Sequence, residues 1–387
     1  MTSIFICGDI INTSFDGQFI DSSILDIVDQ TDYAICNYEG TNLENDHIRK
    51  DMIQHPSTLE SLKKAGFDLL LLANNHITDY GKIGLQSTIT KIEKKGFEYI
   101  GAGFDYDLVY QPLIKQINGI KFGFINVCEA QVGQYTNREK DYGYAWLGAK
   151  EFILAITKLR SQVDKILVFI HAGLENYILP LTEYRRFYRF LCDLGVDCIL
   201  ASHPHVAQGI EKYKNSTIFY SLGNFYFPLE NKKDLVKNRW NTSFSIVLHF
   251  NDDDYSYSVI HHTVDNGIVH IWNPPYEYSE DYLSKVIKSP YYEDNIQKQN
   301  IEAFYAKVTY RYKSVFCGSS INDSFFQSFK HIVNYLFRRK VVYRNTEKER
   351  LRLLLRLNEN DTTRFMVIDT IENILNNSDN KKTINLL

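Results

Sequence analysis

Several short apolar segments of this chain end in polar side chains that could bind a metal ion or transfer a proton. The pairs are Ile4–Cys7 before Gly8-Asp9, Tyr33–Cys36 before Asn37-Tyr38-Glu39-Gly40, Leu69–Ala73 before Asn74-Asn75-His76, Ile166–Ile170 before His171, and Cys198–Ala201 before Ser202-His203-Pro204-His205. Each apolar run has the length and composition of a buried strand. Ligands of open α/β sheets bind beyond the carboxyl ends of the strands. We therefore expect the five clusters to meet at one edge.

No single cluster is decisive. Asp9 alone fits a turn or a helix cap, and His171 alone fits a histidine satisfied within a core. His203-Pro204-His205 is more informative, because two imidazoles flank a rigid proline directly after a buried strand. Five clusters at successive strand ends favour a metal site over five unrelated turns.

The types of side chain in the clusters restrict the metal. Imidazole, carboxylate and amide oxygen, without thiolate, suit Mn²⁺, Fe or Zn²⁺ better than a sulfur-bound structural zinc. A mixed set with one carboxylate able to bridge indicates a two-metal centre, with ions about 3.5–4 Å apart. Such a centre lowers the pKa of bound water and clamps both oxygens of an in-line displacement at phosphorus. The pattern predicts a metal-dependent hydrolase.

The elements that must position these residues alternate along the first 275 residues. Helices are predicted over Ser57–Ala65, Gly84–Lys95, Lys150–Arg160 and Thr182–Leu194, and further strands over Phe122–Val127, Ile218–Tyr220, Ser243–Phe250 and Tyr255–Thr263. Three of the helices are followed by glycine (Gly66, Gly96 and Gly195), which accepts the left-handed conformation that ends a helix. The alternation is the signature of βαβ units, and the last two strands look antiparallel. We predict one layered α/β domain over residues 1–275.

After Pro274-Pro275 the strand rhythm is lost, and residues 276–387 are predicted to form a helical C-terminal region. Within it, Thr346-x-x-Glu349 resembles a capping box opening a helix over Arg350–Leu357. The basic cluster Phe337-Arg338-Arg339-Lys340 fits a solvated face better than a lipid or nucleic-acid site. A nucleic-acid phosphodiesterase that docks its substrate on this cluster is the weaker alternative.

Composition excludes several classes of protein. The 387 residues include 43 basic and 47 acidic side chains, a net charge of −4, which argues against a dedicated nucleic-acid binder. Hydrophobic residues make up 44% and charged residues 23%, which excludes wholesale disorder. The six cysteines form no C-x-x-C pair and are expected to be reduced. No signal peptide or transmembrane segment is recognisable, so we expect a cytoplasmic protein.

The clusters also match a known family. Gly8-Asp9, Asn37-Tyr38-Glu39-Gly40, the segment from Ala73 to Gly81 (A-N-N-H-I-T-D-Y-G), Gly101-Ala102-Gly103, His171-Ala172-Gly173, Ser202-His203-Pro204-His205-Val206-Ala207-Gln208 and Tyr220 to Phe225 occur in the order typical of that family. They resemble the CapA family of bacterial capsule and poly-γ-glutamate synthesis proteins, over roughly residues 3–250. The resemblance implies a calcineurin-like metallophosphoesterase fold, that is, a β-sandwich flanked by helices.

The resemblance also implies residue roles. The implied metal ligands are Asp9 and His205 for a first ion, Asn75, His171 and His203 for a second, and Glu39 as a bridge between the two. His76 would protonate the leaving-group oxygen, with Asp79 orienting its ring. Asn74, Tyr38 and Asn224 are expected to bind substrate.

The chain departs from the usual metallophosphoesterase pattern at four positions. Ile11 stands where a histidine usually follows the first aspartate by two residues, so the first site is one ligand short and one or two divalent ions are expected. Glu39 stands where the bridging residue is usually an aspartate, and its side chain is one methylene longer. Ser202 and Ala172 stand where relatives often carry histidine and tryptophan.

Two functions follow as hypotheses. The first is hydrolysis of a phosphoester, or of an amide in a capsule-type polymer or its precursor such as poly-γ-glutamate. The second is a non-catalytic binding or scaffolding subunit that joins partner proteins of a capsule-synthesis complex. For the second, the aromatic content of 14%, rich in Tyr, would suit a carbohydrate- or partner-binding surface.

Overall fold

The computed structural model describes residues 1–43, 52–131, 133–227, 239–251, 254–308 and 360–376. The basic cluster Phe337–Lys340, the Thr346–Glu349 capping box and the helix expected over Arg350–Leu357 lie outside these residues. The chain divides into two compact units, Met1–Tyr292 and Glu293–Leu387. The domain boundary expected after residue 275 stays a prediction.

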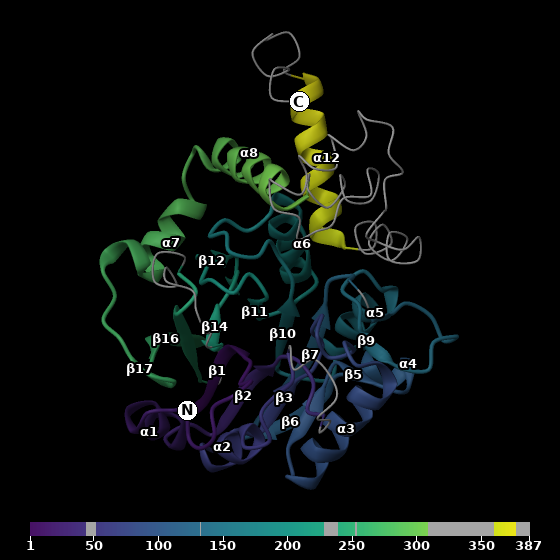
Figure 1. The fold of residues 1–387 in the computed structure, drawn as a ribbon, viewed down its shortest axis with the longest axis vertical. Coiled ribbons are helices and arrows are strands. Elements are labelled where there is room, and N and C mark those ends of the chain that lie inside the picture. The colour runs from purple at the N-terminus through teal and green to yellow at the C-terminus, as the bar shows by residue number, and fades with distance from the viewer. Residues whose placement is uncertain (44–51, 132, 228–238, 252–253, 309–359, 377–387) are drawn as a thin grey trace, which may run out of the picture. The chain divides into compact units, whose positions relative to one another are not determined.

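The first sheet of the first unit carries the N-terminal half of the candidate site. Its strand order is β17-β16-β15-β1-β2-β3-β4, with β14 beside β1 (Figure 1). The strands are β1 (Thr2–Ile10), β2 (Tyr33–Tyr38), β3 (Leu69–Leu71), β4 (Glu98–Ile100), β14 (Asn224–Tyr226), β15 (Thr242–Phe250), β16 (Tyr255–Asp265) and β17 (Ile268–Ile271). β1 to β4 pair in parallel, whereas β15 to β17 add antiparallel strands.

The second sheet carries the remaining histidines. Its order is β12-β13-β11-β10-β7-β6. The strands are β6 (Leu113–Ile117), β7 (Ile120–Cys128), β10 (Lys165–His171), β11 (Cys198–Ser202), β12 (Ile210–Tyr213) and β13 (Ser216–Phe219). A small third sheet joins β5 (Ala102–Gly103), β9 (Gly143–Ala145) and β8 (Gln134–Tyr135).

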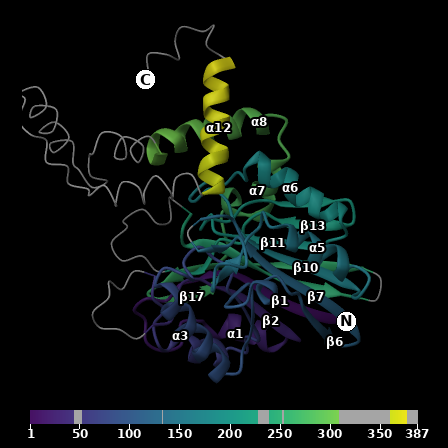
Figure 2. The same cartoon turned by 90° about the vertical axis from the view of Figure 1, so that its right-hand side faces the viewer.

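The two large sheets pack face to face around an apolar core. Ile4, Ile6 and Leu69 of the first sheet share one buried cluster with Phe124 and Leu167 of the second. Alternation along each strand sends every other side chain into this layer. Figure 2 shows the layers edge-on, with α1 and α3 on one side of the sheets and α5 and α6 on the other. The predicted sandwich flanked by helices is therefore confirmed.

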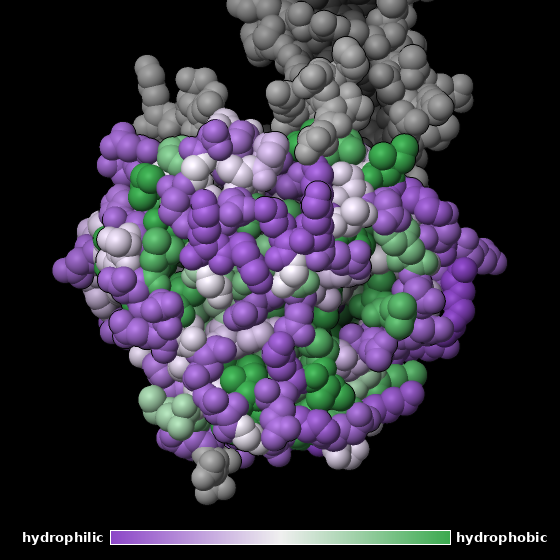
Figure 3. Space-filling model, turned by 90° about the horizontal axis from the view of Figure 1, so that it is seen from below, coloured by the Kyte–Doolittle hydropathy of each residue, from purple (hydrophilic) through white to green (hydrophobic). Residues whose placement is uncertain are grey.

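Helices cover the outer faces of both sheets. Their bounds are α1 (Ser22–Asp29), α2 (Thr58–Lys64), α3 (Gly81–Lys94), α4 (Tyr106–Val109), α5 (Lys150–Leu159) and α6 (Thr182–Asp193). α1 to α3 bury their apolar side chains against the first sheet. Gly123 of β7 lets α5 approach the second sheet, because a Cβ there would lie 2.4 Å from Leu159 Cδ2. On the face viewed in Figure 3, hydrophilic residues predominate and hydrophobic residues form separate areas.

All the predicted strands and helices over residues 1–275 occur, with ends shifted by a few residues. Gly66, Gly96 and Gly195 have φ values of 87°, 70° and 97°, so the predicted left-handed helix ends are confirmed. Most of the elements that the sequence patterns missed are too short to show a period; they are α1, α4, β4, β5, β6, β8, β9, β12, β14 and β17. The five cysteines among the described residues are buried and form no disulfide.

One further α-helix follows the last strand within the first unit, and the later helices of the described residues belong to the second unit. α7 (Glu280–Ile287) is capped by Ser279, whose hydroxyl accepts from the Tyr282 amide, and the Ile210 amide of β12 donates to the Ser284 hydroxyl. α8 spans Tyr292–Ala303, a π-helix follows over Phe304–Val308, and α12 spans Asp361–Asn376. In the described part of the chain, no helix combines the length and the apolarity that crossing a membrane requires.

Candidate metal centre

The carboxyl ends of five parallel strands bring the predicted ligands to one place. Asp9 and Asn37 are paired in register on β1 and β2, as are His171 and Ser202 on β10 and β11. The six predicted metal ligands are all buried: Asp9, Glu39, Asn75, His171, His203 and His205. A metal ion could therefore be held away from bulk water by groups from both sheets.

One group of ligand-type atoms gathers around Nε2 of His171. This nitrogen lies 2.9 Å from Asn75 Oδ1, 3.0 Å from His203 Nδ1 and 3.7 Å from Glu39 Oε1. Two imidazole nitrogens, an amide oxygen and a carboxylate oxygen make a donor set of the borderline kind that Zn²⁺, Fe or Mn²⁺ accepts. Asp9, Glu39 and His171 also offer ligand atoms that all lie within 4.8 Å of one another.

A second group centres on Asp9. Its Oδ2 lies 3.4 Å from His205 Nδ1, and its Oδ1 accepts a 2.6 Å hydrogen bond from Asn37. Ile11, which stands in place of the usual histidine, is fully buried in an apolar cluster with Phe227 and Trp240. The Trp240 ring also packs against His205, with ring centroids 4.7 Å apart. This second group therefore offers fewer ligand atoms than the first.

Glu39 gives the strongest sign that a cation belongs here. Its side chain is fully buried, and among the described residues neither carboxylate oxygen has a hydrogen-bond partner. Burial, followed by repulsion from Asp9, raises the pKa of Glu39 to about 8. Native proteins rarely leave buried carboxylates unsatisfied, because desolvating the charge costs several kcal/mol. A bound cation would satisfy both oxygens.

The surroundings of the buried histidines shift their pKa values in opposite directions. Burial lowers the pKa of His203 to about 4, and burial together with the neighbouring His203 lowers the pKa of His171. Burial also disfavours the charged form of His205, but Glu39 and Asp9 outweigh it and raise its pKa to about 9. The pKa of Asp9 falls below its ordinary range, because the hydrogen bond and the charge of His205 outweigh burial. His171 and His203 are thus neutral at pH 7, as metal ligands must be.

The backbone around the centre adopts conformations that are costly for ordinary residues. His203 and His205 have φ values of 96° and 59°. Left-handed non-glycine residues cost about 1–3 kcal/mol each and cluster at functional sites. Gly8 is required by packing, since a Cβ there would lie 1.9 Å from the Gly223 carbonyl oxygen.

His76 lies at the edge of this group and remains partly accessible. Its Nδ1 is 2.7 Å from Asp79 Oδ2, and its Nε2 is 3.9 Å from Glu39 Oε1. Burial opposes the charged imidazolium, but the Asp79 hydrogen bond and the Glu39 charge raise the pKa of His76 above its ordinary value. The ring therefore carries a proton readily and directs Nε2 toward the ligand group.

The three residues expected to bind substrate are buried and engaged elsewhere. Asn74 accepts hydrogen bonds from the amides of Gly40 and His76 and donates to the Tyr38 carbonyl. Tyr38 belongs to the core beneath the first sheet, and its hydroxyl accepts from Asn42. Asn224 places Oδ1 2.9 Å from His205 Nδ1 and donates to the Trp240 carbonyl. We propose that these three residues position the site rather than contact substrate.

Replacing Asn74 with alanine is expected to destabilise the protein by about 1–3 kcal/mol, because the substitution leaves buried backbone amides without an acceptor. The change would be measured by urea denaturation in the presence of a chelator. The matched variant Asn75→Ala should lose metal affinity with a smaller change in stability, since Asn75 Oδ1 faces the His171 ring. If the two variants lost the same stability and the same metal affinity, the assignment of a structural role to Asn74 and of a ligand role to Asn75 would be wrong.

Three polar groups near the centre received no role from the sequence, although two of them, Asn37 and Ser202, belong to the strand-end clusters. Asn37 bonds to Asp9 and lies 3.1 Å from His171 Nδ1, and Ser202 Oγ lies 3.2 Å from the same nitrogen. Glu129, just beyond β7, places Oε1 3.6 Å from His203 Nε2. The strand-end rule that found the other clusters would have found Glu129, since it follows the predicted strand Phe122–Val127.

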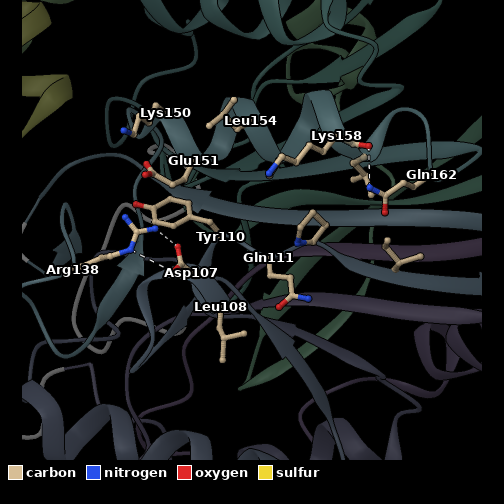
Figure 4. A pocket seen from close by; sticks show the side chains of 14 residues that line it. Asp107, Leu108, Tyr110, Gln111, Arg138, Lys150, Glu151, Leu154, Lys158 and Gln162 are labelled. Carbon is tan, nitrogen blue, oxygen red and sulfur yellow. Dashed lines mark hydrogen bonds and ion pairs between the residues drawn. The ribbon is translucent and has the colours of Figure 1, made fainter.

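A large cavity lies away from this centre. It has a volume of about 650 Å³ and is lined by residues of α4, α5 and neighbouring segments (Figure 4). Arg138 pairs with Asp107 at one end, and Lys150, Leu154 and Lys158 project from α5. None of the predicted ligands lines this cavity, so its size alone does not mark it as the site of chemistry.

The structure by itself defines a two-sheet α/β sandwich with candidate nitrogen and oxygen ligands at its strand ends. Comparison with known proteins adds the family: residues 4–229 match "Bacterial capsule synthesis protein PGA_cap", and the chain belongs to this family. The expected CapA relationship is confirmed.

Two Bacillus proteins illustrate the relationship. The chain is 31% identical over 208 residues to the capsule biosynthesis protein CapA of Bacillus anthracis, covering 51% of each chain. It is 29% identical over 203 residues to the PGA biosynthesis protein CapA of Bacillus subtilis, covering 51% of this chain and 53% of that one. The chain thus spans about half the length of the curated relatives it matches.

Solved structures also align with the chain. A putative 5′-nucleotidase from Staphylococcus aureus aligns with a TM-score of 0.45 at 15% identity, covering 74% of this chain and 58% of that one. The calcineurin-like phosphoesterase YfkN from Bacillus subtilis aligns with a TM-score of 0.41 at 14% identity, covering 70% and 92%.

Proposed function

We propose that this protein is a metal-dependent hydrolase of phosphoesters that acts in the synthesis of a bacterial capsule polymer. The observation that carries the metal part is the buried, unsatisfied carboxylate of Glu39 beside His171, Asn75 and His203. The capsule context is inferred from the names of the family and of its Bacillus relatives.

The residues fit one divalent ion better than two. Glu39, Asn75, His171 and His203 would hold it, and Mn²⁺, Fe or Zn²⁺ suits this mixture of nitrogen and oxygen donors. Asp9 and His205 would hold a second ion more weakly, because Ile11 supplies no ligand. When bound, such an ion activates water as a nucleophile near neutral pH and stabilises charge on phosphoryl oxygens.

Side chains of the protein would carry out the remaining steps of the reaction. His76 would donate its Nε2 proton to the departing oxygen of the ester, and Asp79 would hold the ring through Nδ1. Asn37 would keep the Asp9 carboxylate turned toward the site by donating to Oδ1. Asn224 would hold the His205 ring, and the apolar wall of Trp240 and Phe227 would limit water on that side.

The test compares metal content and hydrolysis in the full chain. After reconstitution with Mn²⁺, Fe²⁺ or Zn²⁺, the wild type is expected to retain about one equivalent of metal and to cleave members of a phosphoester panel. The His203→Ala variant should lose both, because it removes one of two imidazole donors. The His270→Ala variant on β17 is the matched control and should behave as the wild type. A wild type that holds none of the three metals would contradict the proposal.

A binding or scaffolding role is the second candidate, and Ile11 is the observation that favours it. A centre short of one ligand could retain metal for structure without turning over a substrate. In that case the wild type would hold metal and co-purify with a polymer-synthesis enzyme, yet cleave no phosphoester.

A further inference from the structure

We propose that Asn126 is a positioning residue that sets the spacing between Asn75 and His171, two candidate ligands that follow strands of different sheets. In the structure, Asn75 Oδ1 lies 2.9 Å from His171 Nε2. The inference rests on the proposed metal centre and adds to it a residue outside the ligand set.

Asn126 lies on β7, in the layer where the two sheets pack against each other. Phe122 and Phe124 precede it at alternate positions of the same strand and belong to the apolar cluster between the sheets. The alternation of a strand places Asn126 on the same face, and its side chain is buried. A buried amide costs free energy unless its oxygen and nitrogen are hydrogen-bonded, so its partners indicate its role.

The side chain of Asn126 joins the two segments that carry the ligands. Its Oδ1 accepts a 2.7 Å hydrogen bond from the Ala73 amide, and its Nδ2 donates to the Phe169 carbonyl at 3.3 Å. Ala73 precedes Asn75 by two residues, and Phe169 precedes His171 by two residues. One side chain therefore links the first sheet to the second just before each ligand.

Gly101 provides the room for this link. It belongs to Gly101-Ala102-Gly103, a segment of the family resemblance that has no part in the proposed chemistry. A Cβ at Gly101 would lie 2.3 Å from Asn126 Oδ1 and 2.9 Å from the Ala73 nitrogen. Any side chain at this position would therefore displace the hydrogen bond between Asn126 and Ala73.

Apolar packing does not fix the spacing of the sheets at this point. A cavity of about 10 Å³ lies beside Asn126, and Asn37, His171 and Ser202 of the centre also line it. Protein interiors are otherwise close-packed, and it is contact between side chains that holds their layers at a set distance. Beside the cavity, the two hydrogen bonds of Asn126 supply the fixed link instead.

Crystal structures of the metal-free full chain test this role. Asn126→Val shortens the side chain and Asn126→Leu keeps its length, but both remove the two hydrogen bonds. In each variant, the distance from Asn75 Oδ1 to His171 Nε2 should lengthen to about 3.6 Å or more, past hydrogen-bond range. If only one variant folds, its structure decides.

Ser216→Ala is the matched control for the loss of a buried hydrogen bond. The Ser216 hydroxyl donates to the Val196 carbonyl, at the end of β13 that lies away from the centre. This variant should keep the distance between Asn75 and His171 unchanged.

Metal binding gives the second measurement. Calorimetric titration with Zn²⁺ should show a loss of affinity of about 10–100-fold in both Asn126 variants, as for other residues that orient ligands. The visible absorption spectrum of bound Co²⁺ should also change, whereas Ser216→Ala should match the wild type in both measurements.

The outcomes separate this role from the proposed function. A wild type that binds neither metal would refute the proposed function, and the crystallographic distance alone would then decide the role of Asn126. An unchanged distance in a folded Asn126 variant would overturn the role. So would a metal affinity equal to that of the wild type, or an equal loss of affinity in Ser216→Ala.

Discussion

The Glu39→Gln substitution is expected to stabilise the metal-free protein and, at the same time, to weaken its metal binding by more than about 100-fold, beyond the losses typical of outer-shell partners. Both effects have one cause. The Glu39 carboxylate is fully buried with both oxygens unsatisfied, so its charge is unfavourable until a cation is present. A neutral amide of the same size removes that cost and also removes the anionic ligand.

The gain in stability of Glu39→Gln over the wild type should increase with pH. The pKa of Glu39 is raised, mainly by burial and then by Asp9, from 4.5 to about 8 in the folded protein. The folded state therefore holds this proton more tightly than the unfolded state. In the wild type, the contribution of this group to the free energy of unfolding is fully present below about pH 4.5 and is lost as pH rises toward 8. The advantage of the variant should grow over this range and reach on the order of a few kcal/mol.

Chemical denaturation in the presence of a chelator, between pH 5 and 8.5, measures this difference, and calorimetric titration measures metal affinity. The Glu60→Gln variant is the control, since Glu60 is an exposed carboxylate paired with Lys95 on the surface. It should change neither metal affinity nor the pH profile appreciably. A Glu39→Gln protein that is less stable than wild type without metal would show that the carboxylate has a structural partner, and would remove the main argument for the centre.

Replacing His76 with alanine is expected to lower phosphoester turnover by about 10²–10⁴-fold, the usual contribution of general acid–base catalysis. Metal content should not change, because His76 Nε2 lies 3.9 Å from Glu39 and outside the closest group of ligand atoms. Asp79→Asn should give a smaller loss, since it weakens the orientation of the ring without removing it.

Steady-state kinetics on the best substrate of the phosphoester panel, with metal content measured on the same samples, separates these effects. His270→Ala again serves as the histidine control. The assignment would fail if His76→Ala retained full turnover. It would also fail if metal were lost in proportion to activity, because His76 would then be a ligand and not a proton donor.

The sequence by itself determined the strands that carry the candidate site and the clusters that follow them. Apolar runs of strand length and glycine-terminated helices are local patterns, and the carboxyl ends of parallel strands must share an edge. These two facts place Asp9, Glu39, Asn75, His171 and His203 in one neighbourhood without any knowledge of distances.

Only the tertiary structure decided which of these neighbouring residues face the candidate metal centre and which hold its surroundings. Asn74 and Asn75 are adjacent and identical in type, yet the first accepts from the Gly40 backbone and the second faces His171. Glu129 lies 3.6 Å from His203 although 73 residues separate them along the chain, and Asn224 reaches His205 from a short strand that pairs with β1. Such contacts depend on the direction of each side chain after the sheets have packed. Composition and periodicity carry no information about that direction, because they describe only what is near along the chain.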